Sequence, residues 1–480
     1  MPVARRIRRI TTGIPPVAGS GSGSFYSDPY SAYPTRLVDP SISSDVAGGT
    51  TLTRTWNGVS ASYQVYKTIQ YAVNDYLTQG GRRIGLLDST TYTLSADLAY
   101  PSATGLNDSA RVILQGDPSS TEANMAKINL SNGWKIAPTA NGSRGYMTFR
   151  KLWVDGQANR ASYPALMSFG DGDGASATYD GLVVEYCKLS NLSQSSGASN
   201  AGAIKFGQSS SGNNVGCEIR YTKFSNIQVT GAIDNTNTSA VMLEVASTGV
   251  GPGMVLLHHC LFDTCATATN MKVPHTGGYQ FYRNIVRNGG RGFYIGNAGA
   301  STTDCGNVDI YLNLWYGLST DGYMVDAYLT SGQGSRLAIY QNTIAEDVHG
   351  GFAVASFNDI RIHSNAELTS GAGGQYKFKY YGSTPGTCLI TQYDRNAYYG
   401  DTTWVKGSTY STLASWKAAT GTPLNSFSPD ANALSISSLS TEFTNTATRD
   451  YSLKAGSQLL GAGVGGVNIG YDWTDCGPAW

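Results

Sequence analysis

The sequence predicts an all-β solenoid built from short parallel strands. Three observations support this: a short strand-like unit recurs along the chain, glycine-rich turns separate the units, and charged residues are scarce. Charged residues make up 14% of the 480 residues, whereas an average protein has about 25%. The 58 glycines and 41% hydrophobic residues supply many turns and ample material for a core, which argues against wholesale disorder.

Residues 1–61 read as a basic leader and flexible attachment arm. The chain starts with a basic cluster, Arg5, Arg6, Arg8 and Arg9, and Gly19–Ser24 alternates glycine with serine, as in a flexible joint. No apolar run follows the arginines, so the pattern is not that of a secretory signal. Two interpretations stay open for residues 1–24: a solvated tail, or a docking peptide that orders on a larger assembly.

Residues 62–145 are expected to form an N-terminal cap and the first coils. Apolar residues fall at helical spacing from Tyr66 to Leu77, and Gly80-Gly81 ends that pattern. Short apolar stretches at Ile84–Leu87 and Arg111–Leu114 then read as strands. We therefore expect one helix followed by short strands.

From about residue 145 a unit recurs with the pattern apolar-x-apolar-x-x-Asn-x-apolar. Repeats of roughly 23–38 residues with glycine-rich turns indicate a solenoid, and neither helical periodicity nor leucine-rich spacing is present. Stacked parallel strands place like residues about 4.8 Å apart, so an inward Asn can bond the Asn of the next coil. The Asn position is occupied in turn by Leu152, Cys187, Thr222, Cys260, Asn284, Asn313, Asn342, Asn365 and Asn396.

Three segments resemble parts of the right-handed parallel β-helix proteins of the pectate-lyase-like superfamily. Tyr66–Val73 resembles their capping helix, Ser411–Trp416 a short helix near their end, and Asp450–Ser457 part of their closing segment. The resemblance implies central coils at 146–400 and closing coils with a C-terminal cap at 401–480. It identifies the fold better than the activity, because the superfamily includes lyases, glycoside hydrolases, epimerases, phage tailspikes and non-catalytic proteins.

One outward column carries the candidate binding residues. Side chains alternate between core and solvent along a strand, so the residue two positions before the Asn position points outward. Aromatic faces stack on sugar C–H faces while Arg and Glu bond hydroxyls, which predicts a saccharide-binding track. One alternative is a plain solvent-facing ladder in which Glu185 pairs with Arg150 and Arg220. For the tyrosines, the alternatives are aromatic stacking that stabilises the outside of the solenoid, or a subunit contact. The column reads Arg150, Glu185, Arg220, His258, Tyr282, Tyr311, Tyr340 and His363.

Two catalytic chemistries stay open for this face. A glycoside hydrolase needs two carboxylates about 5–10 Å apart, and Glu185 and Glu218 on adjacent coils are one such pair. Glu244 and Asp326 on a following strand are a second pair, and both are candidate substrate-binding residues. A lyase needs a base and a charge-stabilising group, for which His258, Arg220 and Tyr282 are the candidates.

The sequence predicts no cofactor. The resemblance to lyases implies calcium as an option, but the sequence contains no compact cluster of Asp residues that would bind it. The seven cysteines include no CxxC and fit neither a disulfide scaffold nor a zinc site, so most should be buried. Neighbours on a strand point to opposite faces, so His258 and His259 are not expected to share a metal, and we expect a packing or loop role for His259.

A formal net charge of zero argues against nucleic-acid binding, and no stretch is long enough to span a membrane. The favoured interpretation is a tailspike-like or virion-attached β-helix that binds, and in one version depolymerises, host surface polysaccharide. Its expected partners are polysaccharide, virion or other assembly proteins through residues 1–24, and two further copies in a homotrimer. The alternatives are a secreted polysaccharide lyase or glycoside hydrolase and a non-catalytic structural or decorating protein, with a virion or extracellular location throughout.

Overall fold

The computed structural model describes most of the chain between residues 34 and 477. The described ranges are 34–79, 83–100, 111–138, 146–157, 165–169, 181–194, 201–206, 216–229, 238–243, 253–271, 277–296, 305–318, 323–328, 334–345, 350–368, 376–381, 388–400, 403–406, 408–420, 429–471 and 476–477.

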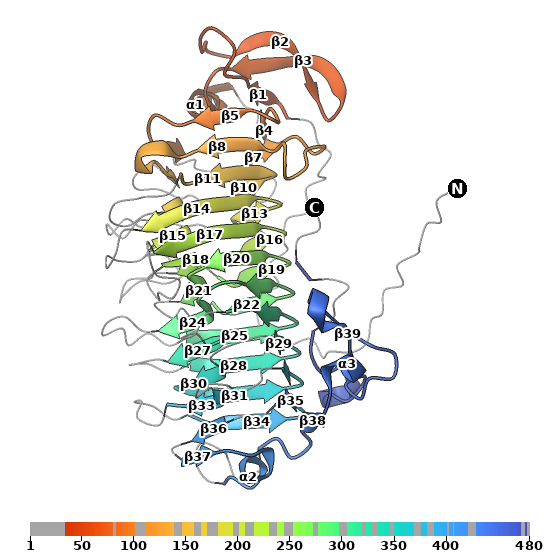
Figure 1. The fold of residues 1–480 in the computed structure, drawn as a ribbon. Helices are drawn as coiled ribbons and strands as arrows, with labels where there is room; N and C mark the ends of the chain where they lie inside the picture. The colour runs from red at the N-terminus through yellow and green to blue at the C-terminus, as the bar shows by residue number, and fades with distance from the viewer. Residues whose placement is uncertain are drawn as a thin grey trace.

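The described strands form three long sheets around one core, which confirms the predicted parallel β-helix (Figure 1). Within each sheet the strand numbers mostly advance by three, because each coil gives one strand to each sheet. Sheet A contains β2 (Thr50–Trp56), β3 (Val59–Tyr66), β1 (Arg36–Val38), β4 (Arg83–Leu86), β7 (Val112–Gly116), β10 (Met147–Arg150), β13 (Val183–Glu185), β16 (Cys217–Arg220), β19 (Val255–His258), β22 (Tyr279–Tyr282), β25 (Cys305–Tyr311), β28 (Gly334–Tyr340), β31 (Phe357–His363) and β34 (Ile390–Asp394).

The other two sheets complete each coil. Sheet B contains β5 (Thr91–Thr93), β8 (Ala126–Asn129), β11 (Leu152–Asp155), β14 (Lys188–Gln194), β17 (Lys223–Val229), β20 (Leu261–Cys265), β23 (Ile285–Arg287), β26 (Leu314–Tyr316), β29 (Thr343–Ala345), β32 (Ala366–Glu367), β35 (Ala397–Tyr399) and β38 (Leu434–Ile436). Sheet C contains β6 (Leu98–Tyr100), β9 (Ile136–Pro138), β12 (Ala165–Phe169), β15 (Ala201–Phe206), β18 (Thr238–Leu243), β21 (Thr267–Met271), β24 (Arg291–Gly296), β27 (Val325–Tyr328), β30 (Gly350–Val354), β33 (Tyr376–Tyr380), β36 (Thr403–Lys406) and β37 (Ser408–Tyr410).

The N-terminal boundary of the body lies earlier than the sequence suggested. β1 lies between β3 and β4 and pairs with both in parallel, so residues 34–61 belong partly to sheet A and not to a separate arm. The strand at Arg36–Val38 is too short to leave a periodic signal, which is why it was missed. Residues 1–24 lie outside the described residues.

The expected helix is present as α1 (Ile69–Gln79), at the N-terminal end of the stack (Figure 1). It begins after Tyr66 because that residue is the last of β3 and pairs with Val38. Ile69, Ala72 and Val73 are buried in the main core.

Among the described residues, no helix is long and apolar enough to cross a membrane.

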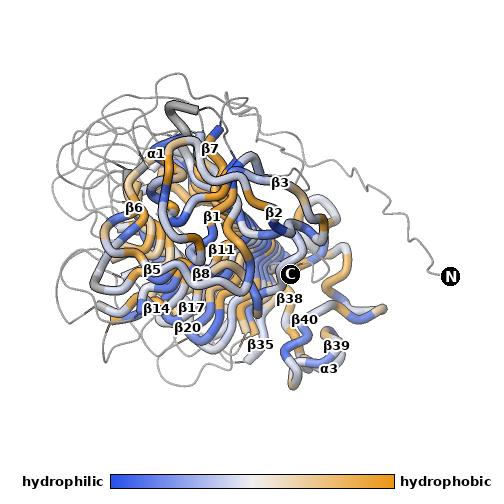
Figure 2. Tube along the Cα trace, turned by 90° about the horizontal axis from the view of Figure 1, so that it is seen from above, coloured by the Kyte–Doolittle hydropathy of each residue, from blue (hydrophilic) through white to orange (hydrophobic). Residues whose placement is uncertain are grey.

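The main core runs through the whole stack of coils, whose strands lie behind one another in the view along the axis (Figure 2). At the C-terminal end α2 (Leu413–Lys417) begins at Thr412, whose side chain caps it by accepting from the Ser415 backbone N–H. Its Trp416 is fully buried and contacts the rings of Tyr393 and Trp404. The helix that the sequence suggested there thus supplies an aromatic closure of the core.

The chain then folds back outside the solenoid, where α3 (Leu439–Glu442) and the hairpin of β39 (Phe443–Asn445) and β40 (Asp450–Leu453) lie beside the later coils (Figure 1). A second apolar cluster forms between this segment and the outer face of sheet B, and it contains Leu314, Tyr316, Ala345, Ala366, Leu368, Ala397, Ile436, Phe443, Tyr451, Leu459, Ile469 and Tyr471. This part of sheet B is therefore covered by the chain itself.

A buried asparagine ladder joins sheets A and B, as predicted. Asn284, Asn313 and Asn342 are at most 1% exposed. The side-chain oxygen of Asn313 accepts from the backbone N–H of Asn284 at 2.9 Å and from its side-chain amide at 3.1 Å. Asn365 and Asn396 continue the same pattern. The ladder ends on a carboxylate that the sequence did not reveal, Asp430, which accepts from the Asn396 backbone N–H at 3.1 Å.

A residue with positive φ precedes each rung. The left-handed conformation turns the chain sharply from sheet A into sheet B and brings the next side chain inward. These residues form what we call the turn ladder: Lys151, Tyr186, Tyr221, His259, Arg283, Leu312, Gln341, Ser364 and Arg395.

Replacing Asn313 with Ala should destabilise the protein. The change leaves the carbonyl of Phe281 without the amide that donates to it at 3.0 Å and the backbone N–H of Asn284 without its acceptor. We expect a loss of about 1–3 kcal/mol per buried group in the free energy of unfolding, measured by denaturant titration. Asn307→Ala is the matched control, because Asn307 is exposed on the neighbouring strand β25. Equal losses in both variants would contradict the ladder's role.

Asp430 should make stability depend on pH. Burial raises the pKa of Asp430 to about 7, although hydrogen bonds from Tyr398 and Asn396 oppose that rise. The folded protein thus keeps a proton that the unfolded chain releases near the ordinary value of 3.8. The stabilisation is complete below that value and is lost as the pH rises through about 7.

The Asp430→Asn variant isolates this effect, because an amide oxygen can still accept from Asn396. Wild type should lose stability relative to the variant as the pH rises from about 4 to 7, with no further change above about 8. Denaturant unfolding of both proteins across this range is the measurement. A stability difference that stays constant with pH would refute the assignment.

Candidate functional site

The predicted outward column of sheet A exists, and we call it the outer ladder. Its members are direct partners on successive strands: Arg150, Glu185, Arg220, His258, Tyr282, Tyr311, Tyr340 and His363. The column two residues earlier carries Glu218, whose neighbours on adjacent strands are Val183 and Leu256. The period-two alternation of strand side chains therefore placed both columns correctly.

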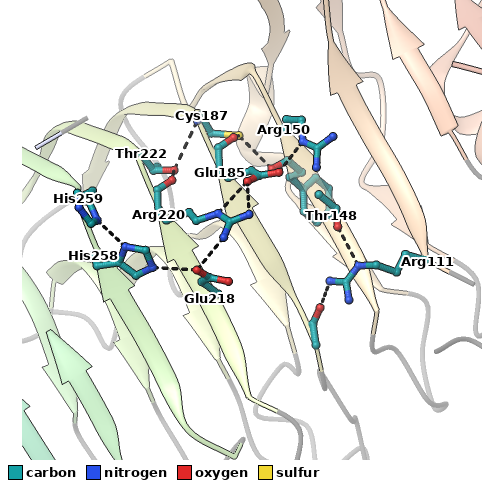
Figure 3. A network of polar contacts seen from close by, with 12 residues as sticks. Arg111, Thr148, Arg150, Glu185, Cys187, Glu218, Arg220, Thr222, His258 and His259 are labelled. Carbon is teal, nitrogen blue, oxygen red and sulfur yellow. Dashed lines mark hydrogen bonds and ion pairs between the residues drawn. The ribbon is translucent and has the colours of Figure 1, made fainter. Parts of the chain in front are cut away.

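The charged part of the outer ladder is a continuous ion-pair network (Figure 3). Glu185 accepts from Arg150 on one oxygen and from Arg220 on the other, where the Arg220 Nη2 lies 2.7 Å away. Arg220 also reaches Glu218, with 3.0 Å between Nη1 and Oε1. Glu185 and Glu218 are only 2% and 4% exposed, so each carboxylate is matched by a cation where water is largely excluded.

This network changes the chemistry open to the two glutamates. The Arg220 guanidinium lies between them (Figure 3), where a hydrolase would place the glycosidic bond. Burial works to raise the pKa of Glu218, but the hydrogen bond from His258 and the charge of Arg220 outweigh it and lower that pKa. A carboxyl with a lowered pKa has no proton to give at neutral pH, which disfavours Glu218 as a general acid.

The two neighbouring histidines contact each other, contrary to expectation. The Nδ1 atoms of His258 and His259 are 2.6 Å apart, and His258 Nε2 lies 2.8 Å from Glu218 Oε1. His259 has a φ of 53°, so it is a turn residue and not a strand residue, and the alternation rule does not apply to it. Both ring nitrogens of His258 are thus engaged, one with Glu218 and one with His259.

The turn ladder adds two tyrosines, Tyr186 and Tyr221, that the sequence did not indicate. The rings of Tyr186 and Tyr221 stack with centroids 4.9 Å apart, and the His259 ring lies 4.8 Å from that of Tyr221. These residues directly precede the Asn position in their repeats. Large side chains recurring at that fixed offset were the signal that could have identified them.

The tyrosines of the outer ladder form one continuous stack. Ring centroids are 4.7 Å apart between His258 and Tyr282, 4.8 Å between Tyr282 and Tyr311, and 4.9 Å between Tyr311 and Tyr340. The neighbouring rings therefore cover both faces of the Tyr311 ring. The stacking of sugar C–H groups on these faces, which we expected from the sequence, is not possible at Tyr311. The stack presents ring edges and hydroxyl groups instead.

Hydrogen-bonding capacity remains along this stack. Among the described residues, the hydroxyls of Tyr282 and Tyr340 have no partner, whereas Tyr311 makes a long contact of 3.5 Å with Gln280. Burial raises the pKa of all three phenols above the ordinary value, so they stay protonated donors. Burial and the charge of Arg361 lower the pKa of His363 to about 4, which keeps the ring at the far end of the stack neutral.

The second candidate pair was expected on the strand that follows the outer ladder, and the structure describes one of its two residues. Asp326 lies on β27 of sheet C, where it is 6% exposed and paired with Arg291 at 2.9 Å. Glu244 lies outside the described residues. Six of the seven cysteines are buried, as expected, and Cys476 is half-buried. Within the described part of the chain, no three His, Cys, Asp or Glu side chains are grouped as a metal site would require.

Comparison with solved structures finds similar folds, and no family is shown for this chain. A solved structure described as a mannuronic acid specific polysaccharide family 6 lyase enzyme from human gut microbiota is 12% identical in sequence, with a TM-score of 0.35. The match covers 67% of this chain and 75% of that chain. No protein-family model matches the sequence, and no curated protein matches it. At this sequence identity and TM-score, neither residue roles nor a substrate can be transferred from that enzyme to this chain.

Proposed function

We propose that the protein binds a polysaccharide lying along the outer face of sheet A. The observation that carries this proposal is the pair of unpartnered hydroxyls on Tyr282 and Tyr340, two coils apart on a rigid stack. Successive rings are 4.8 and 4.9 Å apart, so equivalent groups recur about every 10 Å over two coils. A regular row of donors suits a polymer whose hydroxyls also recur at a fixed interval.

The stacked rings suggest recognition through edges and hydroxyls. Aromatic rings are electropositive at the edge and electronegative on the face, so a row of edges attracts oxygen atoms. The phenol hydroxyls add directed hydrogen bonds. Because neighbouring rings hold each tyrosine in place, little side-chain entropy is lost when a ligand binds.

Depolymerisation is the weaker part of the proposal. Arg220 occupies the space between Glu185 and Glu218, and the lowered pKa of Glu218 disfavours that residue as the acid of a hydrolase. In a lyase, His258 would need a free nitrogen as the base, but both of its nitrogens are engaged. Binding therefore fits these residues better than cleavage, and the lyase, the hydrolase and the non-catalytic structural protein become outcomes of the test.

The setting of this binding is inferred from the sequence. A basic cluster at residues 5–9 followed by a glycine–serine joint suits attachment to a virion or another assembly. A tailspike-like protein would then hold the ladder toward a host surface, alone or as a homotrimer. A variant of the protein that lacks residues 1–24 should no longer attach to the assembly. The soluble body of that variant should still bind the glycan.

The direct test removes the two hydroxyls and keeps the ring stack. The Tyr282→Phe/Tyr340→Phe variant should bind host surface polysaccharide about tenfold more weakly, as expected for two lost hydrogen bonds of about 0.5–1.5 kcal/mol each. Its melting temperature should match that of wild type, because Phe preserves the stacking. Binding to purified polysaccharides is measured by calorimetry, and release of new chain ends is assayed in parallel.

Tyr311→Phe is the matched control, since the Tyr311 hydroxyl faces Gln280 and should contribute little. Unchanged binding by the double variant would show that the tyrosines only stabilise the solenoid. New chain ends would establish cleavage, and their absence would favour the binding or structural interpretation.

A further inference from the structure

A second cluster lies on the outer face of sheet C, around Lys379 of β33. The Lys379 Nζ is 4.9 Å from the ring centroid of Tyr381, 5.7 Å from that of Tyr376 and 5.9 Å from that of Tyr323. Distances below about 6 Å are those of cation–π contacts. Lys379 and the three tyrosines are all partly exposed, so the cluster is open to a ligand.

The cluster is held by a paired carboxylate beneath it. Asp326 accepts from the hydroxyl of Tyr381 at 3.2 Å and pairs with Arg291 at 2.9 Å. Asp326 and Lys379 occupy the same column of sheet C, with the small Ala353 on the strand between them. The negative charge of Asp326 is therefore balanced by Arg291, and its hydrogen bond helps fix one ring of the cluster.

The packing of Tyr323 also depends on the backbone. A Cβ at Gly350 would lie 3.0 Å from the Tyr323 ring, tighter than most such contacts. Glycine at this position on β30 lets the ring lie close to the strand. Burial raises the pKa of Tyr323 to about 12, so the ring carries a neutral hydroxyl.

Lys379 differs in its charge balance from Arg291, the neighbouring cation on sheet C. Arg291 is paired with Asp326. Among the described residues, no carboxylate lies within ion-pair distance of Lys379. Its positive charge is held in place by aromatic rings and remains available to an anion.

We propose that this cluster is a second saccharide site, selective for a sugar that carries a carboxylate. The ammonium of Lys379 would pair with the carboxylate, and the surrounding tyrosines would contact the apolar face of the sugar ring. The inference rests on the proposed function in that the ligand is a saccharide. It places that ligand on a different sheet and assigns it a charge.

Site-specific labelling tests the proposal without knowledge of the natural glycan. The wild-type protein is acetylated at its lysines in the presence of D-glucuronate, D-glucose or neither, and modification of each lysine is followed by mass spectrometry. Glucuronate at ten times its Kd should slow acetylation of Lys379 about tenfold, whereas glucose should have no effect. Lys454, which bonds the Ser440 carbonyl on the C-terminal segment, is the internal control.

Two variants give a second measurement by calorimetry. Lys379→Gln should bind glucuronate about tenfold more weakly, the change expected when about 1.4 kcal/mol of binding energy is lost, while Lys379→Arg and Lys454→Gln should bind it as wild type does. Equal acetylation of Lys379 with both sugars, or unchanged binding by Lys379→Gln, would overturn the proposal.

The outcome is separable from that of the sheet A proposal. The Tyr282→Phe/Tyr340→Phe variant should keep glucuronate protection of Lys379, because those tyrosines lie on another sheet. If the variant loses polysaccharide binding and glucuronate does not protect Lys379 in wild type, only the proposed site on sheet A is supported. If glucuronate protects Lys379 and the variant still binds polysaccharide, only the proposed site on sheet C is supported.

Discussion

The hydrogen bonds of the buried asparagine ladder fix the register on which the rest of the structure depends. Each rung follows a residue in the left-handed region, a conformation that costs about 1–2 kcal/mol for a residue other than glycine. The side-chain oxygen of Asn342, for example, accepts from both the backbone and the side-chain amide of Asn313, at 3.1 and 2.9 Å. Bonds of this kind offset the cost of the turn. Because a slip by one residue would expose the core, the ladder also fixes which side chains point outward.

That register turns the outer face of sheet A into a rigid row. Where the row is charged, the described carboxylates pair with arginines on adjacent coils, as Glu185 does with Arg150, or on the same strand, as Glu218 does with Arg220. Where it is aromatic, rings stack so closely that their faces become internal to the protein. Both arrangements stabilise the solenoid and restrict chemistry: the carboxylates are neutralised and the rings offer only edges and hydroxyls. Sheet B is partly covered by the C-terminal segment, whereas partly exposed polar and aromatic side chains remain on sheets A and C.

Period-two alternation and the repeated Asn position were enough to predict the solenoid, the buried ladder and the outer ladder. Features that depend on single residues outside that period could not be predicted. The contact between two histidines is an example: a loop role for His259 was expected, but not that its positive φ would turn it beside His258. The end of the ladder at Asp430 was missed because aspartate replaces asparagine there and because Asn425 and Asn432 occupy apolar positions of the repeat unit. Ring stacking was one of the alternatives for the tyrosine row, because coils about 4.8 Å apart bring like rings close together, and the structure shows that stacking.

The central claim is that a polysaccharide lies along the outer ladder and is held by its hydroxyls. The most direct measurement is a crystal structure of the protein soaked with oligosaccharides released from bacterial surface polysaccharides by partial hydrolysis. A saccharide should run across β22, β25 and β28, with sugar oxygens within hydrogen-bond distance of the hydroxyls of Tyr282 and Tyr340. A saccharide bound elsewhere on the solenoid, with the outer ladder bare, would contradict this claim.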